Sequence, residues 1–225
     1  MKYENVFSLL EEITIKNSEK ISLGIKTSLG WNEFSYTGLG LLARRLACHL
    51  INDLKIEKGE KVAILSESRP ELGACVFGSV LAGQIIVPLD NKLTIYELNS
   101  ILSDCKPTVL LVSAANYEKA IELKNTIDSI QHIILMENTK VEGNIETLYS
   151  IPKVYQAKWV RRPLNDTVFI IYTSGTTGSP KGVQITFKNM LAQMHDLRIV
   201  FEKILPQMEN VRGLSILPMN HLFEL

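Results

Sequence analysis

One stretch, residues 173–182, carries most of the chemistry that the sequence offers. It reads TSGTTGSPKG, so hydroxyl side chains and a lysine alternate with glycines. Glycines let backbone N–H groups approach a ligand closely, hydroxyls donate to phosphate oxygens, and an ammonium adds positive charge. The candidate ligands of a polyphosphate are Thr173, Ser174, Gly175, Thr176, Thr177, Gly178 and Lys181. On composition alone, a linker or surface hairpin is an equally good interpretation.

The stretch differs from the P-loop of nucleotide hydrolases, which reads GxxxxGK followed by Ser or Thr. Counted from Gly175, Pro180 stands where the second glycine should be, and Gly182 stands where the magnesium-binding hydroxyl should be. The flanking sequences, TVFIIY at 167–172 and GVQIT at 182–186, both predict apolar strands. They favour a hairpin over both a free linker and a P-loop.

The surrounding elements predict an α/β fold. Continuously apolar strands alternate with amphipathic helices, which implies a mostly parallel sheet flanked by helices on both faces. The strands of this alternation are expected at 61–65, 85–89, 108–112 and 132–136. The division expected along the chain is an α/β unit at 1–136, a connecting region with one short helix at 137–166, and a third part at 167–225 that holds the phosphate-loop hairpin, a helix and the start of a second sheet.

Capping residues set the predicted helix boundaries. Helices are expected over about 35–54, 71–83, 94–105, 114–130 and 186–205, and a last strand over 214–219. The predicted caps are Ser68 with Pro70 in the first turn, Thr94 in a capping box with Glu97, and Thr186.

Composition excludes several classes of function. Lys+Arg and Asp+Glu both number 24, so net charge gives no reason to expect nucleic acid as a partner. The one compact basic run, formed by Lys158, Arg161 and Arg162, is interpreted as a solvated surface. The histidines have no metal-ligand spacing, and no residue is assigned to a metal. They are His49, His132, His195 and His221.

The cysteines and the N-terminus indicate a reducing compartment. Cys48, Cys75 and Cys105 form no CxxC pair, and the first two fall in apolar helical patterns that predict buried thiols. The first twenty residues lack a signal-peptide core, and no apolar run is long enough to span a bilayer. A cytoplasmic protein is expected, and peripheral contact with a membrane stays open.

Several segments resemble the adenylate-forming (AMP-binding) superfamily, which contains acyl-CoA synthetases. IIYTSGTTGSPKGVQIT is similar to the signature loop of that family. The segment GEKVAILSESRPELGACVFGSVLAGQIIVPLD and the motif LSILPMNHLFEL resemble long-chain fatty acyl-CoA synthetases in particular. The resemblance covers nearly all of the chain after about Phe34.

The resemblance implies a site and a reaction. The loop from Thr173 to Lys181 would hold the triphosphate of ATP, and His221 would lie beside the carboxylate or acyl pocket. Without the family, the favoured interpretation of His221 is a structural histidine that caps the end of strand 214–219. The implied reaction joins a carboxylic acid, first of all a long-chain fatty acid, to AMP and then to coenzyme A, with ATP and Mg²⁺. No catalytic residue is assigned within this chain.

The resemblance also implies missing parts. The adenine-binding motif, the ribose-binding aspartate and the C-terminal domain with its lysine do not occur in the sequence. Because the chain begins with Met1, it is expected to be the N-terminal part of a longer enzyme, inactive alone and able to self-associate through uncovered apolar surface. Two alternatives stay open: an acyl-AMP ligase that loads a carrier protein, and a non-catalytic α/β module.

Overall fold

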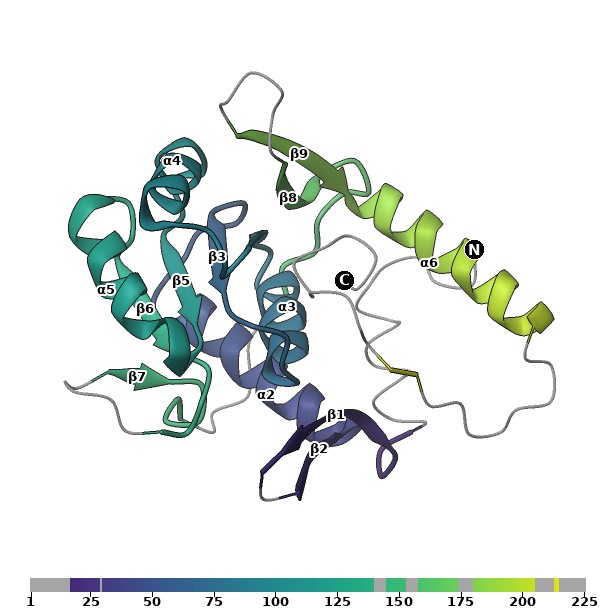
Figure 1. Ribbon diagram of the computed structural model, residues 1–225. Coiled ribbons are helices and arrows are strands. Elements are labelled where there is room, and N and C mark those ends of the chain that lie inside the picture. The colour runs from purple at the N-terminus through teal and green to yellow at the C-terminus, as the bar shows by residue number, and fades with distance from the viewer. Residues whose placement is uncertain are drawn as a thin grey trace.

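The computed structural model describes residues 17–28, 30–139, 145–152, 158–173, 180–204 and 213–214 of the chain. Its main layer is a seven-stranded sheet of order β7-β6-β5-β3-β4-β8-β9 (Figure 1). Neighbouring strands run parallel, except that β8 and β9 form an antiparallel hairpin at one edge. The predicted α/β class is thus confirmed. The strands are β3 Lys61–Leu65, β4 Ile85–Leu89, β5 Val109–Val112, β6 His132–Leu135, β7 Glu146–Thr147, β8 Thr167–Thr173 and β9 Lys181–Thr186.

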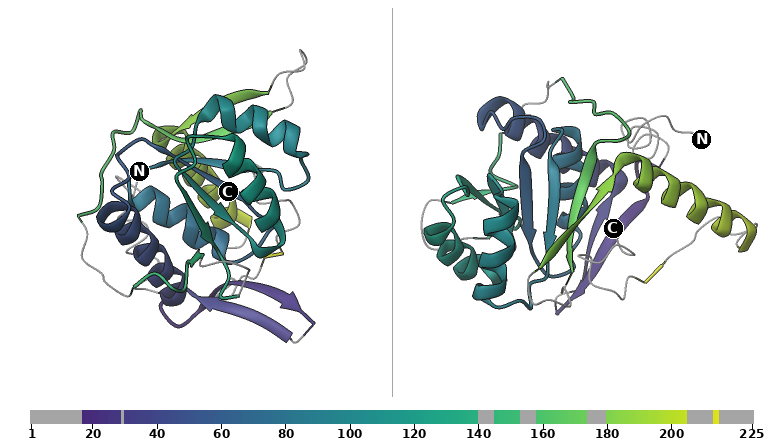
Figure 2. Two further views of the ribbon diagram at one scale, coloured as in Figure 1. Left: turned by 90° about the vertical axis from the view of Figure 1, so that its left-hand side faces the viewer. Right: turned by 90° about the horizontal axis from the view of Figure 1, so that it is seen from above.

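Helices cover both faces of this sheet, and the strands are apolar on both sides for that reason (Figures 1 and 2). In β3, Val62 and Ile64 belong to the core cluster that includes α2 and α3. Ala63 and Leu65 belong to the opposite cluster, which includes α4 and α5. The helices are α2 Tyr36–Cys48, α3 Glu71–Leu81, α4 Ile95–Cys105, α5 Tyr117–Thr126 and α6 Phe187–Ile204.

Hydroxyl residues cap three helices, and for Thr94 and Thr186 this confirms the predicted caps. The hydroxyl of Ser35 accepts a hydrogen bond from the Gly38 N–H at 3.1 Å, at the start of α2. Thr94 and Glu97 form the full capping box of α4. Thr186 accepts from the N–H of Asn189 at 3.2 Å, at the start of α6. Each hydroxyl satisfies a backbone donor that has no partner within its helix.

Two predicted boundaries are wrong. The cap of α3 is Pro70 and not Ser68, and the helix begins at Glu71. A residue before proline is disfavoured in the helical conformation, so the helix starts only after Pro70. The helix predicted over 114–130 is a 3₁₀ turn, η2 Ala114–Asn116, followed by α5, which ends at Thr126. There Ile127 adopts an extended backbone, and its side chain is buried in the core.

The segments beside the sheet hold two features that the sequence analysis did not predict. An antiparallel hairpin, β1 Ile21–Thr27 and β2 Gly30–Ser35, packs on the core cluster of α2 and α3 through Leu23 and Phe34. A π-helical turn, η1 His49–Asp53, continues α2, so the predicted helix does extend to about Leu54. In the described part of residues 137–166, the regular secondary structure is the short strand β7. The short helix expected in this region does not occur among those described residues.

The helix α6 extends away from the sheet (Figure 2). Its residue Leu191 is buried, whereas Leu197 and Phe201 are exposed. The strand predicted over 214–219 lies outside the described residues, except for Leu214. Within the described part of the chain, no helix is both long and apolar enough to cross a membrane.

Candidate functional site

The β8–β9 hairpin brings the two ends of the candidate phosphate loop together. Thr173 is the last residue of β8, Lys181 is the first of β9, and they are direct partners across the two strands. Both side chains are exposed. We call this pair the hairpin base. The other predicted phosphate ligands, Ser174, Gly175, Thr176, Thr177 and Gly178, lie outside the described residues, and so does His221.

The hairpin base lies at the edge of the sheet where ligands of α/β proteins bind. β8 runs parallel to β4, and β4 runs parallel to β3. The carboxyl ends of these strands therefore meet at one edge, and binding sites in open α/β sheets form outside that edge. A hydroxyl and an ammonium that face solvent there can donate to a polyanion. The hairpin that the sequence predicted is confirmed, with the register that pairs these two residues.

Charged residues gather at the same edge, after the ends of β3, β5 and β6. Arg69 Nε donates to Glu71 Oε2 at 3.1 Å, and Arg69 Nη1 donates to Glu67 Oε1 at 3.1 Å and to Glu137. The Ser113 hydroxyl donates to Glu67 Oε2 at 2.7 Å. We call these five residues the Arg69 network. This network was not predicted from the sequence, although the charges of the segment ESRPE between apolar elements were a visible signal.

The electrostatics of the Arg69 network do not suit an anion. Burial lowers the pKa of Arg69, but the hydrogen bond to Glu71 and the three nearby carboxylates raise it overall. Burial raises the pKa of Glu137, against the opposing charge of Arg69. Three carboxylates surround one guanidinium, whose Nε and Nη1 donate to them, so the network holds the loops at this edge in place and its positive charge is already offset.

A second closed arrangement surrounds His49. Its Nδ1 lies 2.7 Å from Asp53 Oδ2, and its Nε2 lies 2.9 Å from Glu146 Oε2. Ionised carboxylates only accept hydrogen bonds, so this arrangement is complete when both ring nitrogens carry a proton and donate, and it favours the imidazolium form. Burial lowers the pKa of His49, but the two hydrogen bonds and charges raise it overall. Within the described residues, no group of three His, Cys, Asp or Glu side chains is arranged to hold a metal ion.

The cysteines and the basic run take no part in a site. The predicted burial of Cys48 and Cys75 is confirmed, and Cys105 is buried as well. Burial raises the pKa of Cys105 to about 12, so its thiol stays protonated and unreactive. In the basic run, Lys158 and Arg161 are exposed as predicted. The prediction is wrong for Arg162, whose mostly buried side chain pairs with Asp166 at 3.0 Å.

Comparison with known proteins shows which family the chain matches. The sequence model described as AMP-binding enzyme matches residues 16–225. A crotonobetaine/carnitine–CoA ligase from Citrobacter koseri is 31% identical over 193 residues, which cover 83% of this chain and 37% of that protein. A long-chain-fatty-acid–CoA ligase from Salmonella typhimurium is 26% identical over 211 residues, which cover 81% of this chain and 37% of that protein. The chain thus spans well under half the length of these relatives.

The fold agrees with that of solved adenylate-forming enzymes. The crystal structure of ATP-bound MatB from Rhodopseudomonas palustris superposes with a TM-score of 0.74 at 20% identity. The superposition covers 98% of this chain and 41% of that protein. At this identity, the likeness shows a shared fold.

Proposed function

Because the chain belongs to the AMP-binding enzyme family, we propose that it supplies the phosphate-binding hairpin of an enzyme that activates a carboxylic acid with ATP. The observation that carries the proposal is the hairpin base. Thr173 and Lys181 face each other, both exposed, at the carboxyl edge of a mostly parallel sheet. The loop between them contributes the remaining donors, Ser174, Gly175, Thr176, Thr177 and Gly178.

The donor set of this hairpin fits a polyphosphate. Hydroxyls and an ammonium donate hydrogen bonds and carry no negative charge that would repel phosphate. The same set offers no carboxylate to a metal ion. In the proposal, Mg²⁺ therefore arrives with the phosphate oxygens of ATP, which is a usual way for proteins to bind this ion. The ion would offset phosphate charge, while Lys181 and the loop position the nucleotide.

The proposed reaction has two halves. A carboxylate oxygen attacks the α-phosphate of ATP, the bond to the β-phosphate breaks, and acyl-AMP and pyrophosphate result. The thiolate of coenzyme A then attacks the acyl carbon, and AMP leaves. Adenylation is needed because an unactivated carboxylate is a poor electrophile. In this scheme His221 lies beside the carboxylate, and the enzyme works largely by positioning anions and offsetting their charge.

We take a long-chain fatty acid as the proposed substrate and coenzyme A as the proposed acceptor. The segments LSESRPEL and LPMNHLFEL support the fatty acid, as does the name of one relative. Both relatives named above are CoA ligases, which supports coenzyme A over a carrier protein. In the proposed division, residues 167–225 form the phosphate-loop part, and the adenine-, ribose- and lysine-bearing parts belong to a longer enzyme.

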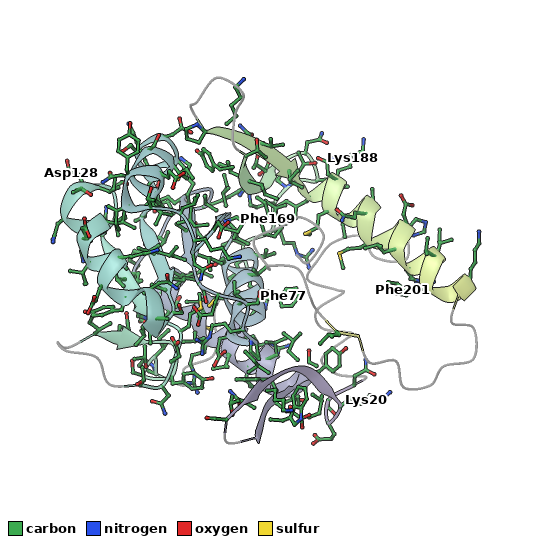
Figure 3. All side chains as sticks on the ribbon, in the orientation of Figure 1. Lys20, Phe77, Asp128, Phe169, Lys188 and Phe201 are labelled. Carbon is green, nitrogen blue, oxygen red and sulfur yellow. The ribbon has the colours of Figure 1, made fainter. Side chains whose placement is uncertain are left out.

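A binding experiment on the 225-residue chain tests the phosphate role. Titration calorimetry with ATP, and separately with inorganic pyrophosphate, is performed on the wild type, Lys181→Ala and Lys188→Ala. Lys188 is a matched control because it is an exposed lysine just beyond the other end of β9, at the start of α6 (Figure 3). We expect Lys181→Ala to weaken both affinities about tenfold, since a hydrogen bond to a charged group contributes roughly 1.5–3 kcal/mol. If the wild type and Lys181→Ala bind these ligands with equal affinity, the hairpin base is not part of the phosphate site.

Activity assays separate the remaining alternatives. Incubated with ATP, Mg²⁺ and a fatty acid, the 225-residue chain should form no acyl-AMP, because the adenine and lysine elements are missing; product detected by mass spectrometry would contradict this. In the longer enzyme, pyrophosphate release that depends on a fatty acid supports adenylation. Acyl-CoA formed on addition of coenzyme A excludes a ligase that works only with a carrier protein.

A further inference from the structure

A tyrosine next to the hairpin base ties the hairpin to a helix of the α/β layer. Tyr172 directly precedes Thr173 in β8, and its hydroxyl donates to Asp104 Oδ2 on α4. The two residues are 68 positions apart in the sequence. Burial and the hydrogen bond to Asp104 both raise the pKa of Tyr172, so the hydroxyl keeps its proton and stays a donor.

The strand β9 leaves room for this tyrosine. Tyr172 is paired across the hairpin with Gly182, the residue that follows Lys181. A Cβ atom added at Gly182 would lie 3.1 Å from Tyr172 Cζ and 2.8 Å from Ile170 Cγ2. The ring therefore lies directly against the backbone of β9, in space that a larger residue would occupy. One side chain thus contacts β9 through its ring and α4 through its hydroxyl.

The position of Asp104 is unfavourable for the helix that carries it. It lies in the last turn of α4, where no basic residue occurs and where the helix dipole disfavours a carboxylate. Asp104 is exposed, so it fills no place in the core. Among the described residues, its hydrogen-bond partner is the hydroxyl of Tyr172. The stability of α4 gives no reason for a carboxylate at position 104. The hydrogen bond to the hairpin does give one.

We propose that Tyr172 and Asp104 are positioning residues for the hairpin base. Their hydrogen bond fixes the carboxyl end of β8 relative to α4, and it thereby sets the direction in which Thr173 and Lys181 present their donors. The inference rests on the proposed function, since it assigns the contact a role in binding phosphate. A hairpin base that is held in place binds a polyanion more tightly, because its side chains and backbone lose less conformational freedom on binding.

The first test uses no ligand. Hydrogen–deuterium exchange is followed in peptides that cover residues 170–186 of the 225-residue chain. We expect Tyr172→Phe and Asp104→Ala to speed exchange there several-fold and to leave β3 and β5 unchanged. Asp104→Asn keeps an oxygen acceptor and should restore slow exchange. Tyr96→Phe, which removes a hydroxyl from an exposed tyrosine on the same helix, is the control. Unchanged exchange in Tyr172→Phe and Asp104→Ala overturns the proposal, whatever the chain binds.

The second test measures ATP affinity at a temperature where every variant is folded. We expect Tyr172→Phe and Asp104→Ala to weaken binding by about three- to fivefold, and the double variant to be no weaker than either single one, because both changes remove the same contact. A role in stability alone would lower the melting temperature and leave these affinities equal to that of the wild type, which overturns the positioning role. If Lys181→Ala still weakens binding in that case, the proposed function stands without this inference. If the wild type itself binds neither ATP nor inorganic pyrophosphate, the proposed function fails, and the positioning role fails with it.

Discussion

The Arg69 network and the hairpin base lie at the same edge of the sheet and use charge in opposite ways. In the network, Arg69 meets three carboxylates, and Glu71 is only 3% exposed. At the hairpin base, Lys181 pairs with Thr173 through the backbone and is exposed. Its ammonium forms no ion pair with any other residue that the structure describes. A closed network stabilises the fold, whereas an open cation contributes little to stability and stays available to a ligand.

The largest expected effect comes from opening the closed network. Arg69→Met should lower the free energy of unfolding by about 3–5 kcal/mol, because it leaves the buried carboxylate of Glu71 with the Tyr149 hydroxyl but without a positive charge beside it. Urea unfolding followed by circular dichroism measures this change. Lys181→Ala should change the same quantity by less than about 0.5 kcal/mol, since its side chain is exposed.

The control for this comparison is Arg161→Met, which removes an exposed arginine. It should behave like Lys181→Ala. If Arg69→Met is as mild as these two variants, the network does not stabilise the fold, and the distinction between the closed and the open region is lost.

The sequence predicted the open region better than the closed one. Apolar strands on both sides of residues 173–182 were enough to predict the hairpin, because its two strands are close in the sequence. The caps Thr94 and Thr186 were predictable for the same reason, since each acts on a residue three positions away. Local chemistry determines such features.

Contacts between distant residues were beyond the sequence. Arg69 and Glu137 are 68 positions apart, as are Tyr172 and Asp104. Which loops meet depends on the strand order, and periodicity predicts strands without predicting their order. The hairpin β1–β2 was missed for another reason. Its burial pattern is mostly exposed, so the apolar alternation that indicates a strand is weak there.

A smaller effect is expected at His49, a second closed region whose strength depends on pH. The pKa of His49 is raised in the folded state, so its stabilising effect is complete below the unfolded pKa of about 6.5 and is lost as the pH rises through the folded pKa. His49→Gln should therefore cost about 1–2 kcal/mol near pH 6 and less near pH 9. Urea unfolding at a series of pH values measures the difference.

His132 must be controlled in that experiment, because burial and the charge of Lys124 lower its pKa and give the opposite pH dependence. The measurement is therefore repeated in a His132→Gln background. Asp53 and Glu146 are the carboxylates that face His49, and Cys48 is the neighbouring thiol, whose pKa is raised by burial and by the charge of Asp53. A cost of His49→Gln that grows with pH in both backgrounds would contradict an imidazolium held by two carboxylates.

The smallest effect on the free energy of unfolding is expected for α6. Here the comparison is between an exposed and a buried apolar side chain. Phe201 is 55% exposed and Phe169 is 4% exposed (Figure 3). Phe201→Ser should change the free energy of unfolding by less than about 0.5 kcal/mol, whereas Phe169→Ala should cost about 3–5 kcal/mol. Phe201 continues a stripe with Met194 and Leu197, spaced for one face of a helix. Sedimentation velocity should therefore show less self-association in Phe201→Ser, since exposed apolar stripes favour association. Equal self-association of the wild type and Phe201→Ser would mean that this face of α6 takes no part in contacts between copies of the chain.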